Sequence, residues 1–218
     1  MFHKHRLEAL SDAVVAIAMT LLILEIKVPT QVPPGRLAAA VLHEDHAWIS
    51  FGISFFLASV FWVLQHRVFD AIAKTGTDSV VLTFVFLAFI STLPFSTALW
   101  GHYLGDKFAA DLYFGNQLAL ALALTAKLEI AHWRRHTVAE PEVRLLRLRL
   151  YLMSAVFLIC VLATPFEAPR HIWIAPFVAV LGARLIRNLV QRRWKRGALK
   201  SVPAAAQIDR AAKVRGDV

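Results

Sequence analysis

Residues 6–29 read RLEALSDAVVAIAMTLLILEIKVP, and this stretch decides the class of fold. Between Asp12 and Glu25 every side chain is apolar except that of Thr20. A membrane-spanning helix needs about 20 predominantly apolar residues, and Pro29 ends the stretch at about that length. A cleaved signal peptide fits less well, because acidic residues bracket a longer apolar segment and no small-residue cleavage site closes it. We therefore predict a membrane-spanning helix here.

The composition of the whole chain supports a membrane protein. The 218 residues are 58% hydrophobic and 18% charged, with a mean hydropathy of +0.57. Soluble domains are about 45–50% apolar and about 25% charged, so the composition nearly excludes an ordinary soluble enzyme. The single cysteine, Cys160, excludes an intramolecular disulfide and any zinc site built from several cysteines.

Further windows of similar length and apolar character follow along the chain, separated by Pro, Gly and charged residues. Their apolar positions have a helical period, which argues against a β-barrel. We predict an all-α membrane protein in which residues 1–200 form one transmembrane domain and residues 201–218 form a mobile cytoplasmic tail. The six expected spans are 10–29, 46–69, 79–100, 111–133, 148–166 and 172–190.

The positive charge is distributed unevenly between the expected loops. The chain has 24 Lys and Arg against 15 Asp and Glu. Eighteen of these basic residues fall on one side of the spans and four on the other, which places both termini in the cytoplasm. Lys127 falls within a span, and we expect its ammonium to extend toward the headgroups. No nucleic-acid partner is expected, because the basic tail offers only Trp194 for base stacking.

Polar residues precede the apolar part of the first span. Ser11 or Asp12 is explained simply as helix N-terminal chemistry, in which an oxygen accepts from free backbone N–H groups. Together with Arg6 they also suggest a buried polar cluster, since ionisable groups at membrane depth usually face a bundle interior. His66 and Arg67, near the inner end of the second span, are the candidate partners.

One face of the first span carries a regular set of side chains. Ile17, Thr20, Leu21 and Leu24 follow the spacing i, i+3, i+4, i+7 and therefore share one helix face. Several copies of this helix around an axis would stack apolar rings with hydroxyls between them, and narrow apolar rings stop conduction by dewetting. Ordinary packing or lipid contact is the commoner role of such a stripe.

These residues resemble a known family. The pattern Arg-x-x-x-Phe-Ser-Asp, followed by small residues, Ile and Thr-Leu-Leu, is similar to the signature of the endolysosomal potassium channel family, transmembrane protein 175. In this chain Leu10 replaces the Phe, which removes an aromatic side chain beside the polar residues. The stretches that carry the resemblance are 6–29, Trp62-x-x-x-His66-Arg67-x-Phe69 and Pro94-Phe95-Ser96-Thr97.

The resemblance implies a homotetrameric channel of the bacterial plasma membrane, selective for potassium, with the first helix of each subunit lining the pore. It implies no cofactor and no catalytic or metal-binding residue, so the chain is not expected to be an enzyme. Bilayer lipid, potassium ions and other copies of the chain are its expected partners. The implied site residues are a constriction at Ile17, Leu21 and Leu24, an ion-lining pair at Ala16 and Thr20, and a structural polar motif at Arg6, Ser11, Asp12 and His66.

Two other functions stay open from the sequence. A proton-conducting channel or proton-coupled transporter would use Asp12 and His66 as titratable groups, although no inverted repeat or pair of broken helices accompanies them. A membrane enzyme or assembly factor has no supporting residues, because Ser11 and Asp12 lack an adjacent base and no phosphate-binding loop appears.

Overall fold

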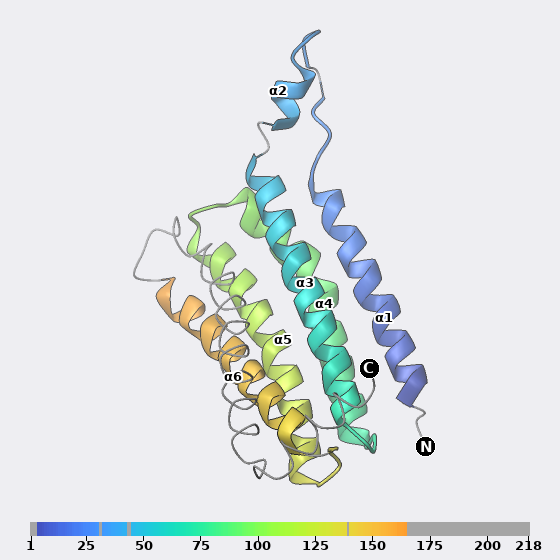
Figure 1. Cartoon of the computed structure of the whole chain (residues 1–218). Coiled ribbons are helices and arrows are strands. Elements are labelled where there is room, and N and C mark those ends of the chain that lie inside the picture. Colours follow the sequence, from blue (N-terminus) through green and yellow to red (C-terminus); the bar gives the residue numbers. More distant parts are fainter. Residues whose placement is uncertain (1–3, 31, 43–44, 139, 165–218) are drawn as a thin grey trace, which may run out of the picture. The chain divides into compact units, whose positions relative to one another are not determined.

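The computed structural model describes residues 4–30, 32–42, 45–138 and 140–164, and these form helices joined by loops (Figure 1). Ile72 and Thr137 form an isolated β-bridge rather than part of a strand. The prediction of an all-α chain is confirmed for these residues. The helices are α1 (Lys4–Leu21), its 3-10 continuation η1 (Leu22–Glu25), α2 (Leu37–Leu42), α3 (Asp45–Ala71), α4 (Thr77–His102), α5 (Lys107–Trp133) and α6 (Glu140–Ala163).

Five of the six expected spans fall on long helices, and the sixth, 172–190, lies outside the described residues, as does the tail 201–218. The bounds of the first span were wrong: the helix begins at Lys4 and ends at Glu25. Apolar windows miss the early start because the first turns are polar and include an i,i+4 ion pair between Lys4 and Glu8, 3.7 Å apart. The short α2 was not predicted.

Four of the described helices are long and apolar enough to cross a membrane, namely α1 with η1, α3, α4 and α6. Helix α5 is as long as α3, with 27 residues. It is less apolar because it contains Asp111, Asn116, Gln117 and Lys127. The last three of these side chains are buried against the other helices. The count of six spans stays a prediction.

Helix α4 is the central element, packed against α1, α3 and α5, while α6 packs against α5 (Figure 1). Between α4 and α5, the ring of Trp100 stacks on that of Tyr113 with centroids 4.4 Å apart. The Tyr113 hydroxyl shares a hydrogen bond of 3.0 Å with Ser54 Oγ, which accepts another from Thr97 Oγ1 at 2.9 Å. Such interhelical hydrogen bonds satisfy polar groups that lie away from water.

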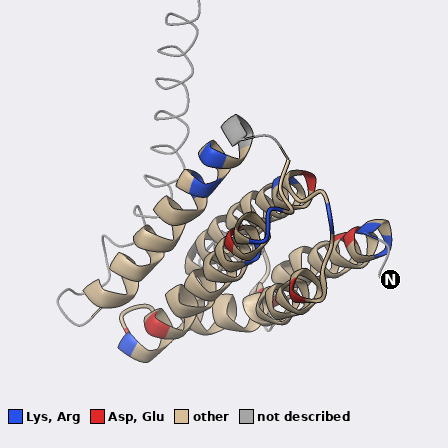
Figure 2. Cartoon of the chain, turned by 90° about the horizontal axis from the view of Figure 1, so that it is seen from below, with Lys and Arg blue, Asp and Glu red and all other residues tan. Residues whose placement is uncertain are grey.

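The start of α1 and the loops α3–α4 and α5–α6 meet at one end of the helices, which we call the basic end. Lys4 Nζ donates to the Ile72 carbonyl at 3.3 Å, and Ala73 N donates to the His136 carbonyl at 2.8 Å. Figure 2 views the chain from below, with charged residues mainly at helix ends and in loops. The basic end gathers loops that the charge count predicts to be cytoplasmic; that orientation stays a prediction.

The prediction for Lys127 was wrong. Its side chain is 2% exposed, and its ammonium donates to Thr83 Oγ1 at 2.8 Å instead of extending to the surface. The same ammonium lies 3.3 Å from the ring centroid of Phe69. Because α3 and α4 cover this face of α5, the hydroxyl and the aromatic ring replace part of the hydration that the charge has lost.

Candidate functional site

Helix α1 has one face packed against the protein and one face exposed. The packed face consists of Leu7, Ser11, Val15, Ala18 and, in η1, Leu22, spaced three or four residues apart. Near the N-terminus of α1, Leu7 forms an apolar cluster with Phe69 of α3 and Val80 of α4, which packs α1 against both helices. This face carries the buried contacts of α1 with its own chain.

The predicted constriction lies on the opposite face. Ile17 is 58% exposed, Leu21 41% and Leu24 70%. Ala16 and Thr20, the predicted ion-lining pair, are exposed as well. The change from α-helix to 3-10 helix after Leu21 leaves Leu24 exposed with the others. All five side chains therefore remain available to contact something outside this chain.

The hydroxyl of Thr20 has a defined orientation. Thr20 Oγ1 donates to the Ile17 carbonyl one turn earlier, at 2.8 Å. A hydroxyl has one proton and two acceptor lone pairs, so this hydrogen bond uses the proton and leaves lone pairs at the exposed face. A lone pair, rather than a proton, is what a cation requires of an oxygen ligand.

Asp12 is tied to α3. The Trp62 indole Nε1 donates to Asp12 Oδ1 at 3.0 Å, and His66 Nδ1 lies 3.8 Å from the same oxygen. The rings of Trp62 and His66 are in contact, with centroids 4.6 Å apart. The carboxylate of Asp12 thus has two neighbours on one face of α3. Trp62 donates a hydrogen bond to it, and His66 forms an ion pair with it when the imidazole is protonated.

The other predicted polar residues are placed differently. Ser11 is buried, and its Oγ has no hydrogen-bond partner among the described residues. Arg6 is exposed and, within the described part of the chain, does not pair with Asp12. Leu10, where the family signature has Phe, is 41% exposed. Within a single chain, Asp12 and His66 of the predicted polar motif lie close together, and Arg6 does not contact Asp12.

Sequence reasoning gave no role to Trp62, although this residue makes the shorter contact to Asp12. The signal was present in the spacing: Trp62 and His66 are four residues apart and therefore lie on one face of a helix. A Trp in a membrane helix is usually assigned to the interfacial aromatic belt, and that general rule does not reveal its use as a hydrogen-bond donor between two helices.

Long apolar helices, buried polar residues that pair between helices, and a first helix with an exposed apolar face define an all-α integral membrane protein. Comparison with known sequences is more specific. Residues 6–94 match the family model of the endosomal/lysosomal potassium channel TMEM175. A potassium channel of Streptomyces collinus is 33% identical over 162 residues, which is 71% of this chain and 79% of that protein. The chain belongs to the TMEM175 family.

A second relative and a solved structure agree with this assignment. A potassium channel of Chamaesiphon minutus is 38% identical over 122 residues, covering 54% of this chain and 60% of that protein. The crystal structure of a lysosomal potassium-selective channel TMEM175 homologue from Chamaesiphon minutus aligns with a TM-score of 0.70 at 30% identity. That alignment covers 84% of this chain and 95% of the solved chain.

Proposed function

We propose that this protein is a potassium-selective channel in which four copies of α1 surround a central pore. The observation that carries the proposal is the exposed face of α1 with Ile17, Leu21 and Leu24, because the buried residues of α1 lie on a different face of the helix. The family is that of the endosomal/lysosomal potassium channel TMEM175, and the two relatives are potassium channels, which points to the same function.

Conduction in this proposal is passive. Rings of Ile17, Leu21 and Leu24 form the narrow apolar part, which expels water when closed and admits a partly hydrated ion when wider. The Thr20 oxygens, whose protons are held by the Ile17 carbonyls, replace some of the water that the ion loses. Ala16 lines the pore one turn before Thr20. Potassium ions are the permeant species, and the channel uses no cofactor and catalyses no reaction.

The assembly and topology follow from the same proposal. Each subunit has six spans, with both termini in the cytoplasm, and residues 1–200 form the channel domain ahead of the tail 201–218. The relatives come from Streptomyces and Chamaesiphon, which supports the bacterial plasma membrane as the location. The meeting of three segments at the basic end supports the orientation, since positive loops stay on the cytoplasmic side.

Flux from proteoliposomes tests the pore. Purified protein is expected to pass potassium down its gradient, and Ile17→Ala and Leu21→Ala are expected to increase the leak of potassium or of sodium, because a smaller ring no longer excludes water. Ile159→Ala on α6 is the matched control, since Ile159 is 63% exposed and lies on a different helix. Equal flux in all four proteins would overturn the assignment of the pore to α1.

A second candidate function is proton conduction, alone or coupled to transport. The observation that favours it is the proximity of two titratable groups, Asp12 and His66, 3.8 Å apart and each 44% exposed. Reversal potentials separate the two functions. A proton conductor follows the pH gradient and loses current in Asp12→Asn, whereas a potassium channel follows the potassium gradient at constant pH.

A further inference from the structure

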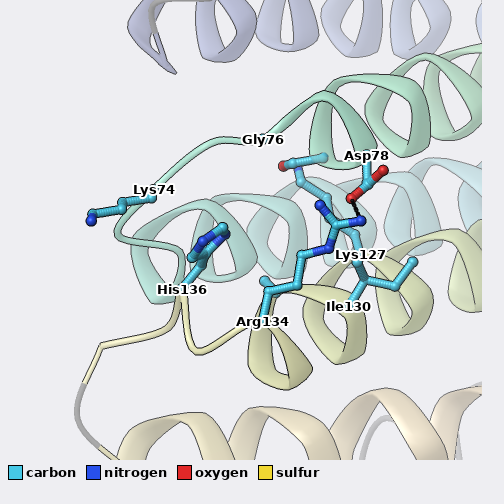
Figure 3. A pocket seen from close by; sticks show the side chains of 9 residues that line it. Lys74, Gly76, Asp78, Lys127, Ile130, Arg134 and His136 are labelled. Carbon is cyan, nitrogen blue, oxygen red and sulfur yellow. Dashed lines mark ion pairs between the residues drawn. The ribbon is translucent and has the colours of Figure 1, made fainter.

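A small cleft lies at the basic end, between the start of α4 and the end of α5, and we call it the α4–α5 cleft (Figure 3). Its rim is exposed at Lys74 and Arg134, whereas Ser79, Lys127 and Ala131 are buried at its inner part. It is separate from the exposed face of α1. The cleft is lined by Lys74, Gly76, Asp78, Ser79, Lys127, Ile130, Ala131, Arg134 and His136.

The first turn of α4 contributes free backbone donors. The N-cap residue is Gly76, which has no side chain to accept from the N–H groups of the first turn. Uncapped N–H groups and the positive end of the helix dipole favour an anion at this position. The carboxylate of Asp78 opposes such an anion, but it is engaged by the Arg134 guanidinium at 2.7 Å.

The side chain of Ser79 gives an independent indication of a ligand. It is only 8% exposed, it lines the cleft, and its Oγ has no hydrogen-bond partner among the described residues. A buried hydroxyl without a hydrogen-bond partner destabilises the fold. An oxygen atom bound in the cleft would accept from this hydroxyl.

The charged groups around the cleft are mostly basic. In Figure 3 the side chain of Arg134, just after α5, and that of His136, in the following loop, extend toward the segment with Gly76, while Lys74 extends away from the centre. The ammonium of Lys127 forms part of the inner lining and uses one of its donors on Thr83. Of the basic side chains, Arg134 and Lys127 therefore lie at the cleft with one carboxylate, that of Asp78, and Lys74 stays at the rim; His136 adds a further charge when it is protonated.

We propose that the α4–α5 cleft binds a phosphate group. The cavity holds about 10 Å³, the room for a single water-sized oxygen, so one phosphate oxygen enters to meet Ser79 and the remaining oxygens stay at the rim beside Arg134 and His136. The phosphate is either the headgroup of an anionic lipid or free phosphate. Basic pockets between helices at the cytoplasmic side are a typical site for lipid headgroups.

Thermal unfolding of the full chain in neutral detergent, followed by tryptophan fluorescence, tests this binding without any measurement of ion flux. The probes are sodium phosphate, compared with sodium chloride at equal ionic strength, and phosphatidic acid, compared with phosphatidylcholine. A group that binds only the folded state raises the unfolding temperature. A higher unfolding temperature with sodium phosphate identifies free phosphate as a sufficient ligand. A higher unfolding temperature with phosphatidic acid alone identifies a lipid headgroup as the ligand. Either result supports the site.

The variants make the test specific. The probe concentration giving half of the shift is expected to rise about tenfold in Arg134→Gln and several-fold in Ser79→Ala, because each loses one hydrogen bond to the phosphate. Asp78→Asn is expected to lower this probe concentration, because the variant frees the Arg134 guanidinium from its ion pair and removes the negative charge that opposes the phosphate. Arg144→Gln, an exposed residue of α6 outside the cleft, is the matched control. No shift with either probe, or the same midpoint in all five proteins, would overturn the proposal.

Discussion

The indole of Trp62 donates a hydrogen bond of 3.0 Å to the carboxylate of Asp12, and this contact joins the first helix to α3. His66 Nδ1, one turn further along α3, lies 3.8 Å from the same oxygen. One hydrogen bond and one close approach from the same face of α3 therefore meet a single carboxylate of α1. The side chains of Ile17 and Leu21, further along α1, are exposed.

Trp62→Phe is expected to loosen α1 while keeping an aromatic ring in place. Loss of the donor should lower the free energy of unfolding by at most about 1 kcal/mol, since the pair is partly exposed. Thermal unfolding in detergent measures the change. Trp48→Phe is the control, because its indole donates to the Val41 carbonyl outside the helical bundle. If Trp62→Phe and Asp12→Asn prove additive in the double variant, the two side chains do not interact.

Opposite faces of α1 are expected to respond differently to the same kind of truncation. Val15 is 1% exposed, so Val15→Ala should lower the free energy of unfolding by about 1–2 kcal/mol through lost packing. Ile17→Ala, at a residue 58% exposed, should leave the stability of a single chain nearly unchanged and alter ion flux. Unfolding measurements on detergent-solubilised protein and flux assays on the same preparations test this. A large flux change in Val15→Ala without loss of stability would contradict the division into two faces.

Much of the fold is predictable from the sequence because lipid restricts the choice of structure. A long apolar segment in a bilayer must satisfy its own backbone hydrogen bonds, so a sufficiently long apolar segment of the sequence usually forms a helix. The windows fail where helices continue through polar residues, as between Lys4 and Glu8, since hydropathy does not register backbone hydrogen bonds in polar turns. They also miss α2, because residues 37–42 are too few to form a window.

The site is less predictable because its contacts join distant parts of the chain. The spacing of Ile17, Thr20, Leu21 and Leu24 is a local property and predicts that they share one face of α1, whereas the exposure of that face is known only from the structure. The burial of Lys127 is not predictable from local sequence, since its partners Thr83 and Phe69 lie on two other helices. A lysine near the end of a span has the same local sequence context whether it extends outward or inward. Only the packing of α3 and α4 decides between the two.

Removal of the acceptor of Lys127 is expected to cost more than removal of its charge. Thr83→Val keeps the shape of the side chain and leaves a buried ammonium without its hydroxyl partner, which should lower the free energy of unfolding by about 2 kcal/mol or more. Lys127→Met removes the charge and fills a similar volume, so its effect should be small or stabilising. In the Lys127→Met background, Thr83→Val should become nearly harmless. Thermal unfolding of the three variants provides the measurement, and equal losses for Thr83→Val in both backgrounds would contradict the pairing.

Gly101 is required by the close approach of α4 to α3. A Cβ at this position would lie 2.5 Å from Ser50 Oγ and 3.2 Å from Ser50 Cβ, both too close for an unmoved neighbour. Gly101→Ala should therefore lower the free energy of unfolding by about 1–3 kcal/mol. Gly115→Ala is the matched control: nothing lies within 4 Å of its Cβ position inside α5, so the better helix propensity of Ala should make this change neutral or stabilising. The exchange variant Ser50→Gly with Gly101→Ala returns one side chain to the contact and should recover part of the loss in thermal unfolding. A Gly101→Ala protein as stable as Gly115→Ala would show that the two helices do not approach so closely.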